Sequence, residues 1–556
     1  MTTSKLNQRR VLVLGLDGAT WDLLTPWINE GKLPHLARLQ QTGSHGPLMS
    51  TIHPVTTPAW ISFLTGRNQG QHGVYDHVQR RPDSYNMELM DATRIQSPLM
   101  FDYLGRQGYR SISVNVPQTF PPPVIPGLMI SGLFGTLVGP DITQPPSLYQ
   151  KIQTVAPNYV VHPDYHPRHA DALGQYARDL VQSEIDRIAV TETLLAEEDW
   201  QYAIVVMTGP DQSHHAFWGL MMDESPAAAP YRDAIFNVYK AIDDELPRLL
   251  RFADENTLLL VISDHGGGPL HALVNLNRWL ADAGLLTFKG RKKGSWRNRL
   301  INFAAASYKN YVPTRLRTWV RRQYQSQFTQ AKERMESQLF ASAIDWSRTQ
   351  AYSLGACGNI FVNLRGREPQ GIVAPGAEYE AVCEQISRDL VQLRSPEGQL
   401  IVKQVLRREE VYHGPHVEKA PDLIVIWHDY GYWGRARYDQ NWPPLFEPVV
   451  NWDFSAIPLT GTHRPEGILI ASGPGVQAGP ISGANLIDIT PTILAFLNTP
   501  VPQGFDGRAL TELFTPGTLT VTYQDDDDHR QTGGGHRFSS EEEAQVLQHL
   551  ERLGYI

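Results

Sequence analysis

The segment VLVLGLDG at residues 11–18 decides the fold. Its apolar run, Val11–Leu16, ends directly in an acid, Asp17, which Gly18 follows. Near-continuous hydrophobic residues are typical of a strand that is buried on both faces, as in a parallel sheet covered by helices. Ligands of open α/β sheets gather beyond the carboxyl ends of the strands, so we expect Asp17 to face a ligand site.

Similar runs recur along the chain and alternate with helical patterns. The further strands are expected at Ser111–Val116, Tyr202–Met207, Thr257–Ser263, Asp422–Trp427 and Gly467–Ala471. The clearest helices are expected at Leu33–Thr42, Ala170–Ala196 and Ala234–Phe252. The alternation predicts an α/β fold with a mostly parallel sheet flanked by helices, and Asp211 and Asp264 also follow strand ends.

The organisation predicts four parts. Residues 1–270 and 421–515 are expected to form one catalytic α/β domain, interrupted at 271–420 by an insertion or cap, and residues 516–556 an acidic linker and a C-terminal helix. Segment 289–334 of the insertion is basic and rich in aromatic residues. Three interpretations remain for it: the cationic solvent face of a helical cap, a helix that contacts anionic membrane lipid, or a surface that attracts an anionic substrate.

Composition and charge exclude several classes of protein. The chain has 556 residues and a net charge of −9, so binding to nucleic acid is not expected. Its two cysteines are too few for a disulfide framework and are expected to be reduced. We find no signal peptide and no run of about 18 apolar residues, which predicts a soluble, cytoplasmic protein. The sequence leaves the oligomeric state open.

Acids and histidines near the strand ends have the spacing of metal ligands. Asp211 and His215 are spaced i and i+4, so a helical turn points both at one ion. Asp264 and His265 precede three glycines that we expect to bend the chain, and His463 is expected in a turn before a strand. Mixed carboxylate and imidazole ligands suit Zn²⁺ best, with Mn²⁺ and Fe²⁺ as alternatives. Each residue alone is more often a cap or a structural residue; the joint pattern indicates a metal site.

Two adjacent threonines precede an apolar helix. Pro58 favours the first helical position, so Thr57 is expected to be the N-cap and Thr56 to lie just outside the helix. Helix N-termini stabilise anions, and an ionised Thr56 hydroxyl there would be an activated nucleophile. In the alternative interpretation both threonines only cap the helix.

Further motifs carry a resemblance to a known family. They are LDG at Asp17, LPHLARLQQTG at 33–43, T-x-P at Thr56, LTGRNQGQHGV at 64–74, D-x-x-x-H at 211–215, SDHGG at 263–267, G-T-H at 461–463 and LIDITPTILAFLNTPVPQGFDGRAL at 486–510. In this order they resemble the alkaline phosphatase superfamily, and within it the type I phosphodiesterase/nucleotide pyrophosphatase group. The resemblance implies a three-layer sandwich with a mostly parallel central sheet, plus an α+β cap insertion.

The resemblance also implies roles for individual residues. Asp211, His215 and His463 would hold one divalent metal ion. Asp17, Asp264 and His265 would hold the second, which Thr56 would coordinate as the nucleophile. It further implies hydrolysis of phosphodiester or phosphoanhydride bonds through a phospho-threonine intermediate, on a small phosphate ester or a lipid headgroup.

The chain departs from the family pattern at one position. Ala59 stands where the diesterases usually place an asparagine that contacts a phosphate oxygen, three residues after the nucleophile. A phosphomonoesterase or phosphomutase therefore remains an alternative, as does a degenerate binding or membrane-adaptor protein. Sulfatases need Cys or Ser in C/S-x-P-x-R, whereas Thr56 and Trp60 stand here. Membrane-bound headgroup transferases carry transmembrane helices, which this sequence lacks.

Overall fold

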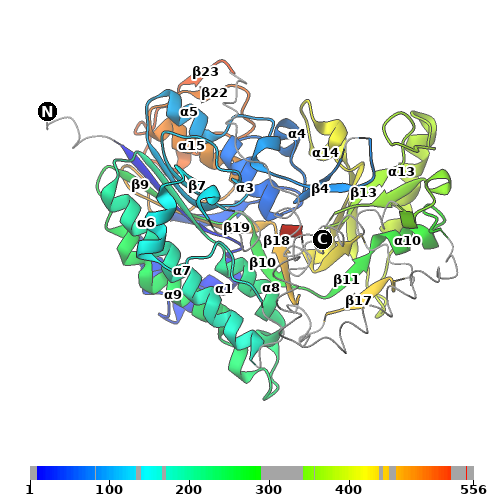
Figure 1. The fold of residues 1–556 in the computed structure, drawn as a ribbon, viewed down its shortest axis with the longest axis horizontal. Helices are drawn as coiled ribbons and strands as arrows, with labels where there is room; N and C mark the ends of the chain where they lie inside the picture. Colours follow the sequence, from blue (N-terminus) through cyan, green and yellow to red (C-terminus); the bar gives the residue numbers. More distant parts are fainter. Residues whose placement is uncertain are drawn as a thin grey trace, which may run out of the picture.

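The computed structural model describes most of the chain, in two lobes of unequal size (Figure 1). The described residues are 9–81, 83–132, 139–165, 171–289, 342–355, 357–436, 443–449, 459–526 and 546–547. The larger lobe, here called the core lobe, holds the main sheet, and the smaller one is called the cap. Among the described residues, no helix is long and apolar enough to cross a membrane.

The core lobe is built on one ten-stranded sheet. Its strands run in the order β20 (Gly479–Pro480), β2 (Ser44–Met49), β19 (Glu466–Ser472), β9 (Thr257–Ile262), β1 (Arg10–Leu16), β8 (Tyr202–Met207), β5 (Ser111–Val116), β6 (Gly127–Ser131) and β7 (Thr143–Gln144), and β21 (Ala484–Asn485) pairs with β2. The central strands pair in parallel, whereas β19 runs antiparallel to β2 and β9, and β7 to β6. The predicted mostly parallel sheet is confirmed.

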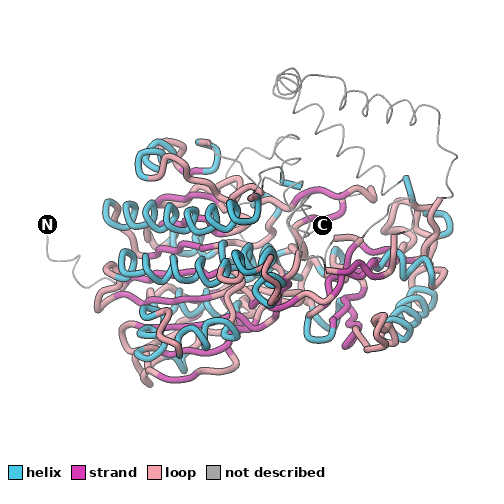
Figure 2. The backbone as a smooth tube through the Cα atoms, turned by 90° about the horizontal axis from the view of Figure 1, so that it is seen from below, coloured by secondary structure: helices cyan, strands magenta, loops and turns pink. Residues whose placement is uncertain are grey.

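Helices cover both faces of this sheet and make three layers (Figures 1 and 2). One face packs with α1 (Trp21–Asn29), α2 (Pro34–Thr42), α7 (Ala172–Glu197), α8 (Gly209–Met222) and α9 (Ala234–Leu250). The other packs with α3 (Thr56–Thr65), α5 (Met100–Arg106) and α15 (Ile489–Phe496). Side chains of β1 alternate between the layers, since Leu12 and Leu14 face the first and Val11 and Val13 the second. This explains why the strand sequences are apolar throughout.

The cap has a separate hydrophobic core. Its antiparallel sheet runs in the order β12 (Ala351–Ser353), β13 (Asn359–Val362), β15 (Leu423–Trp427) and β14 (Val402–Arg407). Two helices, α10 (Leu276–Asp282) and α13 (Ala377–Leu390), contribute to the same core. A second sheet, with the order β16 (Tyr432–Arg435), β11 (Ala272–Asn275) and β17 (Phe446–Pro448), contributes Leu273 and Trp433 to the hydrophobic core of the core lobe.

One predicted strand belongs to a different sheet. The apolar run at residues 422–427 forms β15, which pairs antiparallel with β13 and β14 of the cap and not with the parallel sheet. An apolar run indicates that a strand is buried but not which strand it pairs with. The sequence pattern therefore could not distinguish a strand of the main sheet from a buried strand of the cap sheet. The expected domain boundaries stay a prediction, and we propose that the cap continues past residue 420 through Trp427.

Several shorter helices and strands complete the described part of the chain. They include α4 (Gln69–His72), α6 (Leu148–Val155), α14 (Arg408–Val411) and the pairs β3 (Val78–Arg80) with β4 (Met87–Leu89) and β22 (Val501–Pro502) with β23 (Tyr523–Gln524). The basic segment 289–334 lies outside the described residues except for Lys289, and so does most of the C-terminal helix. At the start of the acidic run, Asp526 pairs with buried Arg67 at 2.5 Å.

Candidate metal centre

Parallel pairing brings the predicted acids to one edge of the main sheet. Because β1 pairs in parallel with both β8 and β9, the residues that follow these strands meet at the same edge. The Gly18 N–H donates to Asp264 Oδ1 at 3.2 Å. Gly18 has a φ of +71°, and a Cβ atom there would lie 2.8 Å from Asp211 Cβ, so glycine is required. All seven predicted site residues are buried here, each at most 5% exposed.

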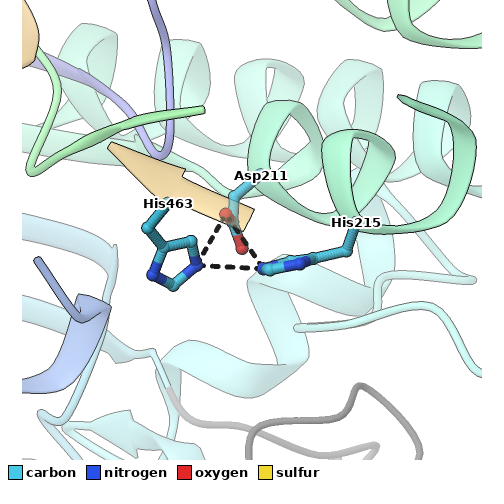
Figure 3. A group of neighbouring side chains, drawn as sticks. All are labelled: Asp211, His215 and His463. Atoms are coloured by element: carbon cyan, nitrogen blue, oxygen red, sulfur yellow. Dashed lines mark hydrogen bonds and ion pairs between the residues drawn. The ribbon is translucent and has the colours of Figure 1, made fainter. Parts of the chain in front are cut away.

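The first group consists of Asp211, His215 and His463 (Figure 3). Asp211 and His215 lie one turn apart on α8, as predicted, while His463 comes from the short strand β18 (Gly461–Arg464). Asp211 Oδ1 is 3.4 Å from His215 Nε2 and 3.3 Å from His463 Nε2. The two imidazole Nε2 atoms are 2.9 Å apart. Three ligand atoms therefore converge on one point.

The second group surrounds His265. Its Nε2 atom lies 3.1 Å from the Thr56 hydroxyl, 3.3 Å from Asp264 Oδ2 and 3.7 Å from Asp17 Oδ1. One ligand atom each of Asp17, His265 and Asp211 also lies within 4.8 Å of the other two. Asp211 therefore lies between the two groups, which are adjacent.

All three imidazoles are held by the nitrogen that faces away from the centre. In each of the three, Nδ1–H donates to a backbone carbonyl. The distance from Nδ1 to the carbonyl oxygen is 2.9 Å from His215 to Gly461, 2.8 Å from His463 to Pro54 and 3.0 Å from His265 to Gly266. With Nδ1 donating, each Nε2 presents a lone pair to the centre, which is the usual arrangement of metal-bound histidines. The close approach of the lone pairs on His215 and His463 is favourable when a cation lies between them.

The buried carboxylates also call for a cation. Burial, with the charges of neighbouring acids, raises the pKa of both Asp17 and Asp264 well above the ordinary range. Burial would also raise the pKa of Asp211, but His215 and His463 outweigh it and hold that pKa well below the ordinary range. Asp17 Oδ1 and Asp264 Oδ2 are buried and have no hydrogen-bond partner among the described residues. The donor set therefore fits divalent cations.

The helix behind Thr56 begins earlier than expected. The structure makes Val55 the N-cap of α3, without a side-chain hydrogen bond, and places Thr56 in the first turn. The prediction of Thr57 as N-cap was wrong, and so was the interpretation of both threonines as caps. The Thr56 hydroxyl faces His265, and the Thr57 hydroxyl faces His77 and Gln118.

Other expectations around the centre need correction. The glycines after His265 form the extended strand β10 (Gly266–Pro269), paired with β18, so His463 also lies on a strand and not in a turn. At Gly267 a Cβ atom would overlap His214 Nδ1, so close approach and not bending requires this glycine. His214 is buried in α8, and its Nε2 lies 3.1 Å from the Tyr239 hydroxyl.

Ala59, where the family pattern has asparagine, lies within α3. It is fully buried and belongs to the hydrophobic core of that layer. The choice between diester and monoester therefore stays open.

Sequence reasoning missed three neighbours of the centre. His77 and Gln118 contact Thr57, and the Trp433 ring packs edge-on against His463 at a centroid distance of 5.3 Å. These residues come from loops and from a small cap sheet, and no repeated spacing marks them. Burial lowers the pKa of His77 to about 3, with a further contribution from His463, which keeps the imidazole neutral.

A cleft of about 150 Å³ lies at the end of β2. Ile52, which lines it, precedes Thr56 by four residues, so the Cα atoms of these two residues are at most roughly 13 Å apart. The lining combines core residues such as Asn485 with Val411 of the cap, and the lining residues carry no formal charge.

Comparisons with known proteins give one family and a set of similar folds. The family model for type I phosphodiesterase / nucleotide pyrophosphatase matches residues 11–443. Phosphonoacetate hydrolase from Sinorhizobium meliloti 1021 in complex with phosphonoformate is 13% identical, with a TM-score of 0.52 over 89% of this chain and 96% of that one.

A second solved structure is less similar, and no curated protein matches. Human ectonucleotide pyrophosphatase / phosphodiesterase 5 is 14% identical, with a TM-score of 0.47 over 91% of this chain and 100% of that one. At these identities the phosphonoacetate hydrolase likeness shows the fold alone.

Proposed function

The chain belongs to the type I phosphodiesterase / nucleotide pyrophosphatase family of phosphoric ester hydrolases, and on this basis we propose that it hydrolyses phosphodiester or phosphoanhydride bonds through a phospho-threonine intermediate on Thr56. One observation carries the proposal. The Thr56 hydroxyl lies 3.1 Å from His265 Nε2, at the edge of a buried set of acids and imidazoles that fits two divalent cations. A hydroxyl nucleophile beside such a set is what phosphoryl transfer requires.

The ligand groups divide between two ions in the proposal. Asp211, His215 and His463 hold the first ion. Asp17, Asp264 and His265 hold the second, with Thr56 beside them. Zn²⁺ is the proposed metal because mixed nitrogen and oxygen ligands suit it, and Mn²⁺ is the alternative. Bound ions would neutralise the attacking and leaving oxygens of an in-line displacement.

The protein groups perform the rest of the reaction. The Thr56 hydroxyl gives its proton to solvent and its oxygen attacks phosphorus, while the bond from phosphorus to the leaving oxygen breaks and that oxygen takes a proton from solvent. Water then attacks the phospho-threonine, the bond between phosphorus and the threonine oxygen breaks, and the phosphate product leaves as Thr56 regains a proton. The N-terminus of α3 presents backbone N–H groups and a positive dipole end to the phosphate, because no side chain caps it.

The substrate class comes from the family resemblance. We propose a small phosphate ester or a lipid headgroup, and the uncharged lining of the cleft at the end of β2 supports placing its neutral part there. The phosphomonoesterase or phosphomutase alternative uses the same residues, and the degenerate binding protein would lack turnover. A cytoplasmic location and a peripheral membrane contact through 289–334 remain predictions.

A paired hydrolysis assay tests the proposal. A bis-nitrophenyl diester and the matching monoester are compared on zinc-loaded and chelator-treated protein. We expect metal-dependent preference for the diester and no measurable turnover by Thr56→Ala, which should still hold metal. Preference for the monoester would favour the phosphatase or mutase, and absence of both turnover and metal would favour the binding protein. A fully active Thr56→Ala would remove the covalent mechanism.

A further inference from the structure

The start of α3 is held in an unusual way. Helices usually begin with a Ser, Thr, Asn or Asp cap, whose loss costs about 1 kcal/mol. Here the cap residue is Val55, which has no polar side chain, and Pro58 has no backbone N–H. The helix end that presents Thr56 must therefore be fixed by other contacts.

Thr57 supplies those contacts. Its fully buried hydroxyl lies 2.7 Å from His77 Nδ1 and 3.2 Å from Gln118 Oε1. The amide nitrogen of Gln118 donates to the Met90 carbonyl, which turns Oε1 toward Thr57. The Thr57 hydroxyl therefore donates to Gln118 and accepts from the Nδ1–H of His77, so its rotamer is fixed from both sides.

The same contacts continue into the cap. The backbone N–H of His77 donates to Asp76 Oδ1 at 2.6 Å, and the side-chain amide of Asn359 donates to Asp76 Oδ2 at 3.2 Å. Asn359 is the first residue of β13 in the cap sheet. Asp76, His77 and Asn359 are each at most 6% exposed. A buried polar chain thus runs from the cap to the residue next to the nucleophile.

We propose that Thr57 is a positioning residue that holds the Thr56 hydroxyl in line for attack, and that the cap sets this position through Asn359, Asp76 and His77. The inference rests on the proposed function, because it takes Thr56 as the nucleophile. Its physical basis is that a misplacement of about 1 Å in a reacting group can lower a rate on the order of a hundredfold.

The test compares two threonines of one helix. Thr57→Val removes the hydroxyl at nearly constant volume, and Thr57→Ser keeps it. Thr65→Val is the matched control: Thr65 is equally buried at the other end of α3, and among the described residues its hydroxyl donates to backbone carbonyls of the same helix, those of Ile61 at 2.8 Å and of Ser62. For each variant, kcat and KM for the nitrophenyl diester, zinc content and melting temperature are measured.

We expect Thr57→Val to lower kcat by roughly 10- to 100-fold with zinc content and KM nearly unchanged, and Thr57→Ser to recover most of the loss. Thr65→Val should lose comparable stability but keep kcat within about twofold. An unchanged kcat in Thr57→Val, or an equal loss in Thr65→Val, would overturn the proposal.

Asn359, at the cap end of this series of hydrogen bonds, gives a second variant. Its kcat tests the proposal even if Thr57→Val fails to fold. Asn359→Ala should lower kcat several-fold, and its effect should shrink in the Thr57→Val background because both act through His77. An unchanged kcat in Asn359→Ala, or fully additive effects, would remove the cap from the proposal. An active Thr56→Ala would instead refute the proposed nucleophile, so the two failures are distinguishable.

Discussion

The acids of the candidate metal centre and Asp422 of the cap are buried in opposite ways. In the metal centre, Asp17 and Asp264 lie among other acids and have no arginine or lysine bonded to them within the described part of the chain, and their pKa values are raised by burial and by those acids. In the cap, Asp422 is equally buried but accepts two hydrogen bonds from Arg367, at 2.7 and 2.6 Å, and its pKa is lowered.

The comparison separates function from architecture. Removing the arginine partner of a buried acid destabilises the surrounding fold, whereas a cluster of buried acids with raised pKa values marks a candidate functional site. The seven predicted site residues belong to the core lobe. The cap contacts one of them through Trp433, which packs against His463, and Asn359 of the cap donates to Asp76 of the core lobe.

Removing one acid from each lobe should break the comparison most strongly. Asp264→Asn is expected to lower kcat/KM on the order of a thousandfold, because several kcal/mol of transition-state stabilisation depend on the second ion. Diester hydrolysis and zinc content measure this. Asp422→Asn is the matched control, and it should keep both while losing thermal stability. Full zinc content with full activity in Asp264→Asn would contradict the ligand assignment.

A second comparison of the metal centre with the cap uses one histidine from each. His463→Ala should weaken zinc binding on the order of a hundredfold, since it removes one ligand of the first ion. The measurement is zinc retained after dialysis against a graded series of chelator. His413→Ala is the control: His413 is exposed on the cap and pairs with Asp506 at 2.6 Å, so its loss should leave zinc retention unchanged. Equal retention in both variants would exclude His463 from the ligand set.

The arginine partner can be removed instead of the acid. Arg367→Met should destabilise the cap by about 2 kcal/mol, because among the described residues it leaves the buried Asp422 carboxylate with two side-chain partners, Tyr379 and Arg408. Denaturant unfolding and zinc content are measured together, and zinc content should not change. Arg365→Met, at an exposed position in the same turn, should change stability by less than about 0.5 kcal/mol. Loss of zinc in Arg367→Met would show that the two lobes are not independent.

The smallest expected effect is on how the free energy of unfolding changes as the pH falls. The pKa of Asp422 is lower in the folded protein than in the unfolded chain, because Arg367 and Arg408 outweigh the effect of burial. Its contribution to stability is therefore complete above the unfolded value, near 3.9, and is lost as the pH falls through the folded value. Urea titrations between about pH 6 and pH 3 should show a shallower stability loss in Asp422→Asn than in the unchanged protein. Parallel curves would contradict this linkage.

Local patterns predicted the fold and much of the site. Asp17, Asp264 and His265 follow apolar strands, and Asp211 and His215 share one helical turn, so short-range spacing was sufficient to place them. The strand at His463 was missed because it depends on pairing with residues 266–269, almost 200 positions away. The partners of Thr57 were missed for the same reason, since His77 and Gln118 reach it only through tertiary packing.

The strand order also affects how the chain is synthesised. β19 inserts between β2 and β9, although it follows β9 by roughly 200 residues, which a ribosome adds over about 10 to 40 seconds. During that interval the nascent chain exposes two apolar strand edges that later share one partner, and such edges promote aggregation. The synthesis of β19 therefore sets the earliest time at which these two strand edges can be paired and the main sheet completed.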